Sequence, residues 1–556
     1  MIENREIKKE RYLLLFLLVF ALVFARWCVY GFQYWYQLDD YIQYHNYTWG
    51  GVSPGEVVRR LGLLAARPLA GAADVYFWRL FFPVMLLGSA LISAMYAASA
   101  CLFRWVFRRH FGTGYAFLAV YALLPLGIEG TYWMSAATRI VTGLFFAALA
   151  LWAFERWCSG EKGCWAGVYA VCQLLSYGFY EQLIPFSAAS VLLLALVSRG
   201  KSVKRRLVSL WSFIAAGVYF AFVTVFHESA LYGAKTGYIL PKSSYYFKVF
   251  LPEVLSQLKS AFLGGGFYTL TRAGARGLKM LVSDGLWLYA LVVLLLCAAL
   301  FFFARRHEER KNERPAAALV VGILLALAPL APFFLAETTW FSFRGTVCSF
   351  CGIALIADTL LRLIFSRVSW GRTAVPLLTA VFALWCCVCS VSEMRDYRDT
   401  TEKDAQVCRA IEAGLRENGT VAAELRIGVL NVSPSYLPEQ NSYYHEHIHG
   451  VTESQWALSG ALEYYMDFQP LPSVTPIREG QYYAAWNRDA MQLPNFDFLY
   501  IYDGEDTLVP VTLISQAEGQ YLLLDRDGGV RAVVFEEEGK GYLTLISPTL
   551  PSDAPS

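Results

Sequence analysis

YLLLFLLVFALVFARWCV, residues 12–29, is apolar from end to end except for Arg26. A run of about 20 such residues is long enough to cross the hydrocarbon core of a membrane as a helix, where backbone groups find no other partners. Because no small-residue cleavage site follows it, we expect a retained first span rather than a signal peptide. The charged residues 3–11 before it are then expected in the cytoplasm.

The rest of the first 391 residues repeats this pattern. Hydrophobic residues make up 56% of the 556-residue chain, more than the roughly 45–50% of soluble domains. The net charge of +2 gives no field that would favour a nucleic-acid partner. We expect about eleven spans in all, the later ones near 78–103, 113–129, 138–155, 165–178, 184–198, 207–226, 285–304, 316–335, 345–364 and 373–391.

Alternate loops between these spans are rich in Arg and Lys. They are 104–110, 156–162, 199–206, 305–314 and 362–372. Basic loops stay in the cytoplasm of a membrane protein. The other loops, above all 31–77 and 227–284, and everything after residue 392 are then expected outside. This predicts a multi-pass protein of the cytoplasmic membrane with an inner N-terminus and an outer C-terminal domain.

Beyond Ser392 the composition becomes mixed and polar. Helical spacing is expected over 396–418 and 453–466, and strands over 425–430, 498–502, 508–513, 521–524, 530–535 and 542–546. The turn residues 527–529, Asp-Gly-Gly, are typical of a hairpin. We therefore divide the chain into a mainly α transmembrane bundle, residues 1–391, and a soluble α+β domain, residues 392–556.

The first outer loop holds two adjacent acids, Asp39 and Asp40, among aromatic residues. Two carboxylates side by side at a membrane surface repel each other, so one can be held as a general base, or the pair can hold a divalent cation such as Mg²⁺ or Mn²⁺. The aromatic residues suit stacking on sugar rings, but membrane interfaces recruit them as well.

The same predicted side gathers further polar residues that could bind a substrate: Glu129, Arg139, Tyr180, Glu181, His227, Glu337 and Arg344. Arg139 and Arg344 each begin a span, where a guanidinium either grips a lipid-linked phosphate with two hydrogen bonds or simply reaches out to the interface. Glu181 lies between two spans with almost no loop, so it needs a partner. That partner is either a substrate hydroxyl or one of these two arginines.

Other candidate sites have simpler interpretations. The histidines at 445, 447 and 449 would share one face of a strand and could bind zinc, although a polar surface segment explains them as well. Cys386, Cys387 and Cys389 lie in an apolar helix and are expected to be small buried residues. Walker, dinucleotide-binding, G-x-S-x-G and H-E-x-x-H motifs are absent from the sequence, so nothing in it favours nucleotide chemistry.

An acid pair in the first outer loop, about eleven spans, basic inner loops and an outer C-terminal domain together resemble the GT-C class of membrane glycosyltransferases. In many members the pair is Asp-Glu followed by an arginine, whereas here Tyr41, Ile42 and Gln43 follow Asp39-Asp40. The resemblance implies transfer, with inversion, of a sugar from a polyprenyl-phosphate carrier to a cell-surface glycan, lipid or protein on the outer face. It also implies that Asp39 is the general base and that Asp40 orients it or holds a cation.

Three other functions stay open. A lipid-linked glycan flippase or other transporter would place its site at mid-membrane within repeated halves, and we find no repeat. A polysaccharide polymerase or ligase would share the donor and the location. A non-catalytic surface protein would use the tail to bind a partner.

The outer loop 227–284 has helical spacing of its own. Apolar residues recur among polar ones over 245–262, as in a helix that lies at the membrane interface. Gly264-Gly265-Gly266 follows, and we expect it to break this helix.

Overall fold

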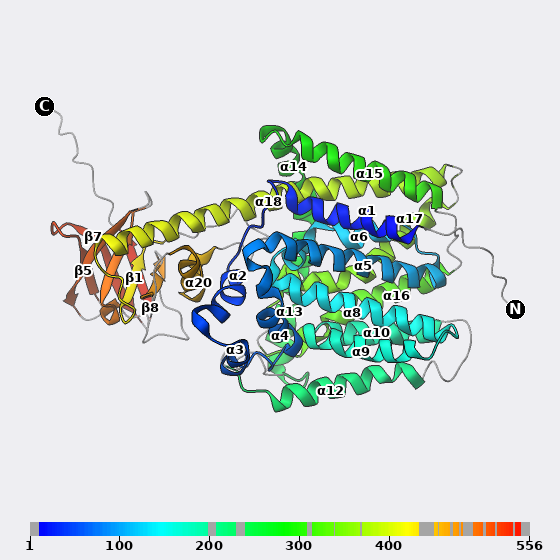
Figure 1. Cartoon of the computed structure of the whole chain (residues 1–556), viewed down its shortest axis with the longest axis horizontal. Helices are drawn as coiled ribbons and strands as arrows, with labels where there is room; N and C mark the ends of the chain where they lie inside the picture. The colour runs from blue at the N-terminus through cyan, green and yellow to red at the C-terminus, as the bar shows by residue number, and fades with distance from the viewer. Residues whose placement is uncertain are drawn as a thin grey trace. The chain divides into compact units, whose positions relative to one another are not determined.

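The computed structural model describes residues 11–197, 207–229, 239–307, 314–337, 340–366, 368, 370–432, 450–453, 455–466, 471–477, 480–481, 493–503, 507–517, 520–537 and 540–545. Their contacts divide the chain into two compact units (Figure 1). The first unit comprises residues 1–34 and 50–395, and the second comprises 35–49 and 396–556.

Each of the eleven predicted spans overlaps a helix of the first unit. These helices are α1 (Tyr12–Ala25), α5 (Met85–Phe111), α6 (Ala116–Leu123), α8 (Met134–Cys158), α9 (Cys164–Phe179), α10 (Leu183–Val197), α12 (Trp211–Val225), α15 (Trp287–His307), α16 (Pro315–Leu327), α17 (Phe350–Phe365) and the first part of α18 (Gly371–Glu417). In the described part of the chain, seven helical segments are long and apolar enough to cross a membrane. The protein is therefore a multi-pass membrane protein built as a helical bundle.

Helix α8 forms the centre of this bundle. It packs against α5, α9 and α10, and 78% of its most apolar 18 residues are buried, against 17% in the span that contains α12. Figure 1 shows α5, α8, α9 and α10 side by side, with α12 at one edge. The apolar side chains of α12 that remain exposed are thus those expected to meet lipid.

Basic residues gather at one end of the bundle. Here α5, α8, α15 and α17 end with arginines in or next to their last turns. His110 lies 3.0 Å from Glu155, and Arg362 bonds to the carbonyl of Gly112, so the ends of different helices meet. We call this the basic end, and we call the other the opposite end.

Short helices cover the opposite end. They include α3 (Pro54–Leu61), α4 (Pro68–Tyr76), η3 (Trp78–Val84), η4 (Pro125–Gly127), α7 (Ile128–Thr131), η8 (Ala328–Phe334) and η9 (Phe343–Ser349). Several lie in loops that the charge pattern predicts to be outside. They supply the polar residues that form the candidate site.

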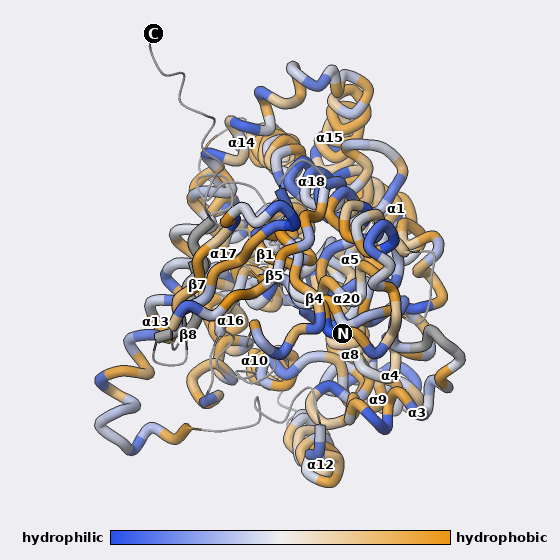
Figure 2. The backbone as a smooth tube through the Cα atoms, turned by 90° about the vertical axis from the view of Figure 1, so that its left-hand side faces the viewer, coloured by the Kyte–Doolittle hydropathy of each residue, from blue (hydrophilic) through white to orange (hydrophobic). Residues whose placement is uncertain are grey.

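A long helical segment also runs along the opposite end. It is built from the π-helix η6 (Tyr246–Phe250), α13 (Leu251–Lys259), the π-helix η7 (Ser260–Gly265) and α14 (Gly266–Ser283). The helix predicted over 245–262 is confirmed, but the predicted break at the three glycines is wrong, because the segment stays helical through them. A Cβ on Gly265 would lie 2.1 Å from Cε1 of Phe343, so this glycine permits close packing rather than a break. Figure 2 shows α13 and α14 in succession along one side of the unit.

The buried positions of this segment explain its π turns. They recur every fourth residue, first at 246, 250 and 254 and again from 261 to 281. An α-helix has 3.6 residues per turn, so a step of four overshoots the face by about 40°. A π turn holds more residues and reduces this drift.

The second unit contains an eight-stranded sheet. Its strands are β1 (Arg426–Leu430), β2 (Ser473–Ile477), β3 (Gly480–Gln481), β4 (Phe498–Tyr502), β5 (Leu508–Ala517), β6 (Gln520–Leu524), β7 (Val530–Glu537) and β8 (Lys540–Leu545). The order is β2-β1-β4-β5-β6-β7-β8-β3, with β1 parallel to both of its neighbours. Gly528, with φ 81°, lies in the β6–β7 hairpin that its sequence predicts.

Helix α2 (Asp39–Tyr44) packs against α20 (Gln455–Tyr465) within the second unit. Tyr41 and Tyr465 share a hydrogen bond of 3.0 Å between their hydroxyls, and Ile42 lies against Gly460. The Gln37 side chain donates to Thr401 of α18 at 2.9 Å. The acid pair thus belongs to the same compact unit as the sheet.

Candidate functional site

Arg67 and Glu181 form a two-pronged ion pair at the opposite end of the bundle. Arg67 Nε donates to Glu181 Oε2 at 2.7 Å and Nη2 donates to Oε1 at 2.6 Å. The guanidinium also lies 4.5 Å from the centre of the Tyr180 ring. This planar contact uses the fork geometry that lysine lacks.

The ends of two helices position this pair. Tyr180 has an extended backbone that ends α9, and Arg67 caps α4, directly before Pro68. A residue before proline avoids the helical region, so Arg67 cannot continue the helix backwards. Gly178 lets α9 approach α4 closely, since a Cβ there would be 2.6 Å from Leu69.

Arg344 and Glu129 form a looser pair nearby. Their side chains are 3.9 Å apart, Nε to Oε1, and the backbone N–H of Arg344 donates to Glu129 Oε2 at 3.3 Å. The guanidinium lies over Trp133, 5.5 Å from the ring centre. Gly130 makes the approach possible, because a Cβ there would lie 3.2 Å from Cα of Arg344.

The two pairs belong to one electrostatic group, which we call the Arg67–Arg344 cluster: Arg67, Glu129, Tyr180, Glu181 and Arg344. Burial would raise the pKa of Glu181, but the guanidinium of Arg67 and, to a smaller extent, that of Arg344 lower this pKa below its usual value. Gln182 joins the segments that carry the cluster by donating to the carbonyls of Pro329 and Gly345, each at 3.0 Å. The ionised form of Glu181 is therefore favoured, and the contact that holds its carboxylate is the one with Arg67.

Arg139 has a different environment. It donates from Nη2 to Asp74 Oδ2 at 2.8 Å and bonds to the carbonyl of Ser135. The side chains of Arg139 and Asp74 are only 9% and 1% exposed, whereas those of Arg67 and Arg344 are 26% and 33% exposed. Of these arginines, Arg67 and Arg344 are the better placed to meet a ligand from outside.

Asp39 and Asp40 differ in their surroundings. Asp40 is fully buried, and its Oδ2 accepts a hydrogen bond of 3.0 Å from the backbone N–H of Gln37. Asp39, at the start of α2, is partly exposed. Leu38 just before it has φ 37°, a conformation that a bulky residue rarely adopts. The chain thus turns sharply at the point where Asp39 begins the helix.

The pair does not form a ready-made cation site. Within the part of the chain that the structure describes, no three His, Cys, Asp or Glu side chains group so that they could hold a metal ion. One of the two carboxylates is also engaged by the backbone of Gln37. Magnesium usually needs several oxygen ligands, so we assign no step to the Mg²⁺ or Mn²⁺ expected as possible.

The remaining predicted residues lie apart from these contacts or outside the described residues. His227 is exposed and its Nδ1 lies 3.0 Å from the carbonyl of Thr224, and Glu337 is exposed. The histidines at 445, 447 and 449 fall outside the described residues. Cys386, Cys387 and Cys389 are buried, as predicted.

Sequence reasoning missed Arg67 and Asp74. The sequence suggested a substrate hydroxyl, Arg139 or Arg344 as the partner of Glu181, whereas in the structure Glu181 pairs with Arg67. Both missed residues lie in the first long loop: Arg67 directly precedes Pro68, and Asp74 directly follows a stretch of small residues, Ala70 to Ala73. The signal in the sequence was Glu181, which lies between two spans with almost no loop and therefore needs a partner.

No protein-family model matches the chain. No curated protein matches its sequence. Among solved structures, it is similar to the crystal structure of ArnT from Cupriavidus metallidurans bound to undecaprenyl phosphate. The two sequences are 13% identical, the match covers 81% of this chain and 87% of that chain, and the TM-score is 0.35.

Proposed function

We propose that the protein transfers a sugar from a polyprenyl-phosphate carrier to an acceptor at the opposite end of the bundle. The observation that carries the proposal is the Arg67–Arg344 cluster, in which two partly exposed guanidiniums, each paired with its own glutamate, lie at the end of the membrane helices. A lipid-linked phosphate presents its charge at this depth, and arginine binds phosphate through its planar fork.

Arg67 and Arg344 are the proposed phosphate ligands. A guanidinium has five N–H donors, and Arg67 directs those on Nε and Nη2 to Glu181. Its side chain is still 26% exposed, so a phosphate can reach it. Glu181 and Glu129 fix the directions of the two forks before any substrate arrives. Preorganised donors of this kind stabilise the charge that develops on a leaving phosphate.

Asp39 is the proposed general base. In the reaction the acceptor hydroxyl oxygen bonds to the anomeric carbon, the carrier phosphate leaves with the electron pair of the broken C–O bond, and Asp39 takes the proton. Its partial exposure and the rare backbone conformation of Leu38 both favour it over the buried Asp40, because strained backbone often occurs at functional sites. Asp40 then supports the turn that carries Asp39.

We further propose that the basic end faces the cytoplasm and the cluster faces outward. Cysteine substitution tests this orientation in intact cells. Asp527→Cys, at an exposed position in the turn between β6 and β7, should react with a membrane-impermeant maleimide without permeabilisation, whereas Gly160→Cys, in the turn after α8, should react only after it. The reverse pattern would overturn the orientation.

Transfer from a purified lipid-linked sugar tests the activity. Asp39→Asn keeps size and a hydrogen-bonding oxygen but loses basicity, so the rate should fall by about 10²-fold or more. Asp40→Asn can still accept from Gln37 and should lose far less.

Two outcomes would contradict the proposal. Full transfer by Asp39→Asn would show that Asp39 is not the general base. Carrier binding without any transfer would favour a flippase. Transfer that requires a growing polysaccharide as acceptor would instead identify a polymerase or ligase.

A further inference from the structure

The helix α14 carries its charged and apolar side chains on two different flanks. Its buried face, Thr269, Ala273 and Gly277, packs inward, and a Cβ on Gly277 would lie 2.1 Å from the carbonyl oxygen of Val388. With 100° per residue, Arg272, Arg276 and Lys279 fall on one side of this face. Phe267, Leu278 and Val282 fall on the other.

The apolar flank is strongly exposed within the first unit. Phe267 is 71% exposed, Leu278 52% and Val282 60%. An amphipathic helix at the surface of a membrane protein places such residues among acyl chains and its cations among headgroups. The buried face of α14 is already covered by α18. The positions of the basic and apolar flanks therefore decide which side of α14 meets the lipid headgroups and which side meets the acyl chains.

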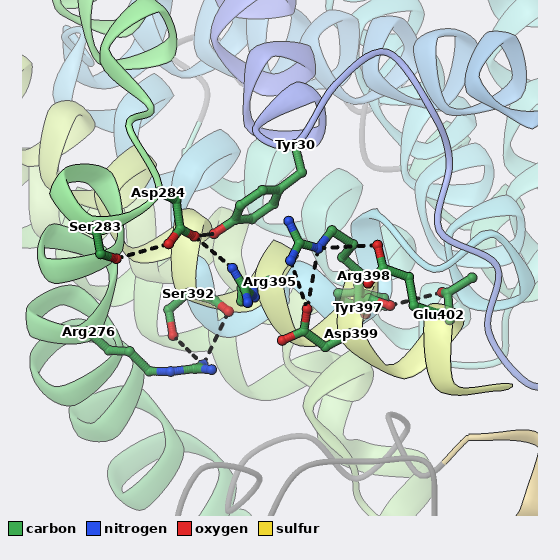
Figure 3. Close-up of polar contacts among 11 residues, drawn as sticks. Tyr30, Arg276, Ser283, Asp284, Ser392, Arg395, Tyr397, Arg398, Asp399 and Glu402 are labelled. Carbon is green, nitrogen blue, oxygen red and sulfur yellow. Dashed lines mark hydrogen bonds and ion pairs between the residues drawn. The ribbon is translucent and has the colours of Figure 1, made fainter. Parts of the chain in front are cut away.

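Polar contacts hold the C-terminal half of α14 in this orientation (Figure 3). Arg276 donates to the hydroxyl of Ser392 at 2.9 Å. Asp284, just after α14, accepts hydrogen bonds from Arg395 at 2.8 Å and from the Tyr30 hydroxyl at 3.2 Å. One basic residue is therefore used for anchoring, and Arg272 and Lys279 are exposed.

The charge balance of the whole segment is one-sided. Residues 246–283 contain five basic residues, Lys248, Lys259, Arg272, Arg276 and Lys279, and a single acid, Glu253. This acid lies on α13, and α14 itself carries none. The anionic groups that a membrane offers at the depth of an interfacial helix are phosphates of its lipids.

We propose that α14 is a binding surface for anionic phospholipids, with Arg272 and Lys279 as the headgroup ligands. The ligand is the bilayer lipid itself, not the carrier of the transfer reaction. The inference rests on α14 and its contacts with α18, so it stands whether or not the protein is a transferase.

The test measures lipid selectivity of the full-length protein in vesicles of phosphatidylcholine. Electron spin resonance with spin-labelled phosphatidylglycerol or phosphatidylcholine gives their relative association with the protein surface. A basic residue near a membrane surface is worth about fivefold in affinity for anionic lipid, but many lipids touch the protein at once. We therefore expect Arg272→Gln with Lys279→Gln to lower the phosphatidylglycerol preference at least about twofold.

Two variants serve as controls. Arg59→Gln with Arg60→Gln removes two exposed charges from α3 at the same end and should leave the preference unchanged. Arg272→Lys with Lys279→Arg keeps the charges and should also keep it. Unchanged selectivity in the double glutamine variant would overturn the proposal, as would an equal loss in the α3 control. Displacement of the bound phosphatidylglycerol by polyprenyl phosphate would assign the surface to the carrier and likewise overturn it.

Discussion

Arg67 and Glu181 are 114 positions apart in the chain, yet their side chains meet through two parallel hydrogen bonds of 2.7 Å and 2.6 Å. The pair joins the start of α4 to the turn between α9 and α10. It fixes the plane of the guanidinium. The pair therefore has a structural role and, in the proposed reaction, a substrate-binding role.

Arg67→Lys should separate these roles. Lysine keeps the charge but cannot make two parallel bonds, and one charge-assisted hydrogen bond is worth about 1.5–3 kcal/mol. We expect kcat/KM for the lipid-linked donor to fall about tenfold or more, with the helical signal in circular dichroism unchanged. Arg60→Lys, in an exposed pair with Glu56, is the matched control, and an equal loss there would contradict the assignment.

The Arg139–Asp74 pair should govern stability rather than donor use. Both side chains are buried, and removal of one partner leaves an uncompensated charge, at a cost of about 3–5 kcal/mol. Asp74→Ala should therefore lower the midpoint of thermal unfolding in detergent clearly. Asp74→Leu combined with Arg139→Met removes both charges and should recover much of the loss. If Asp74→Ala melts like the wild type, the pair is not structural.

Glycines at helix contacts should be intolerant of a methyl group. Gly277→Ala would place a Cβ 2.1 Å from the backbone oxygen of Val388, so α14 must shift away from α18, and overpacking of this kind costs about 1–3 kcal/mol. Gly217 on α12 has nothing within 4 Å of its Cβ position. Gly217→Ala should be neutral or slightly stabilising, because alanine favours a helix. Thermal unfolding of the two variants compares them directly.

Glu463 on α20 should make stability depend on pH. Burial raises the pKa of its carboxyl to about 7, compared with about 4.3 in an unfolded chain. Between these values the folded state holds the proton more tightly, so this contribution to stability is complete below about pH 4.3 and is lost as pH rises through 7. Glu463→Gln should reduce the drop in unfolding midpoint between pH 5 and pH 8. An identical drop in the variant would show that another group titrates.

Most elements of both units could be predicted from local pattern. Each apolar run forms a helix, and the expected strand Phe498–Tyr502 has the same bounds in the structure. The strands β2 and β3 were missed, since Ser473–Ile477 contains a proline and Gly480–Gln481 is too short to show alternation. The change of composition at residue 392 does not interrupt α18, because charged residues continue a helix as well as apolar ones do.

The pairing of polar residues could not be predicted in the same way. Periodicity along a chain gives the face of a helix, but the partner of Glu181 depends on how α4 is placed against α9. The same holds for Asp40, whose carboxylate is used by a backbone group three residues earlier. A buried acid and an exposed one look alike when they are neighbours in sequence. The structure separates them.

The π turns η6 and η7 have a further consequence for the long helix that contains α14. A purely α-helical segment that buried every fourth residue would turn its buried face by about 40° at each step. The two π turns take up part of this rotation. Neighbouring helices can therefore stay in contact with the segment along its length without winding around it, and the hydrogen bond from Arg276 to Ser392 joins its last part to one of them, α18.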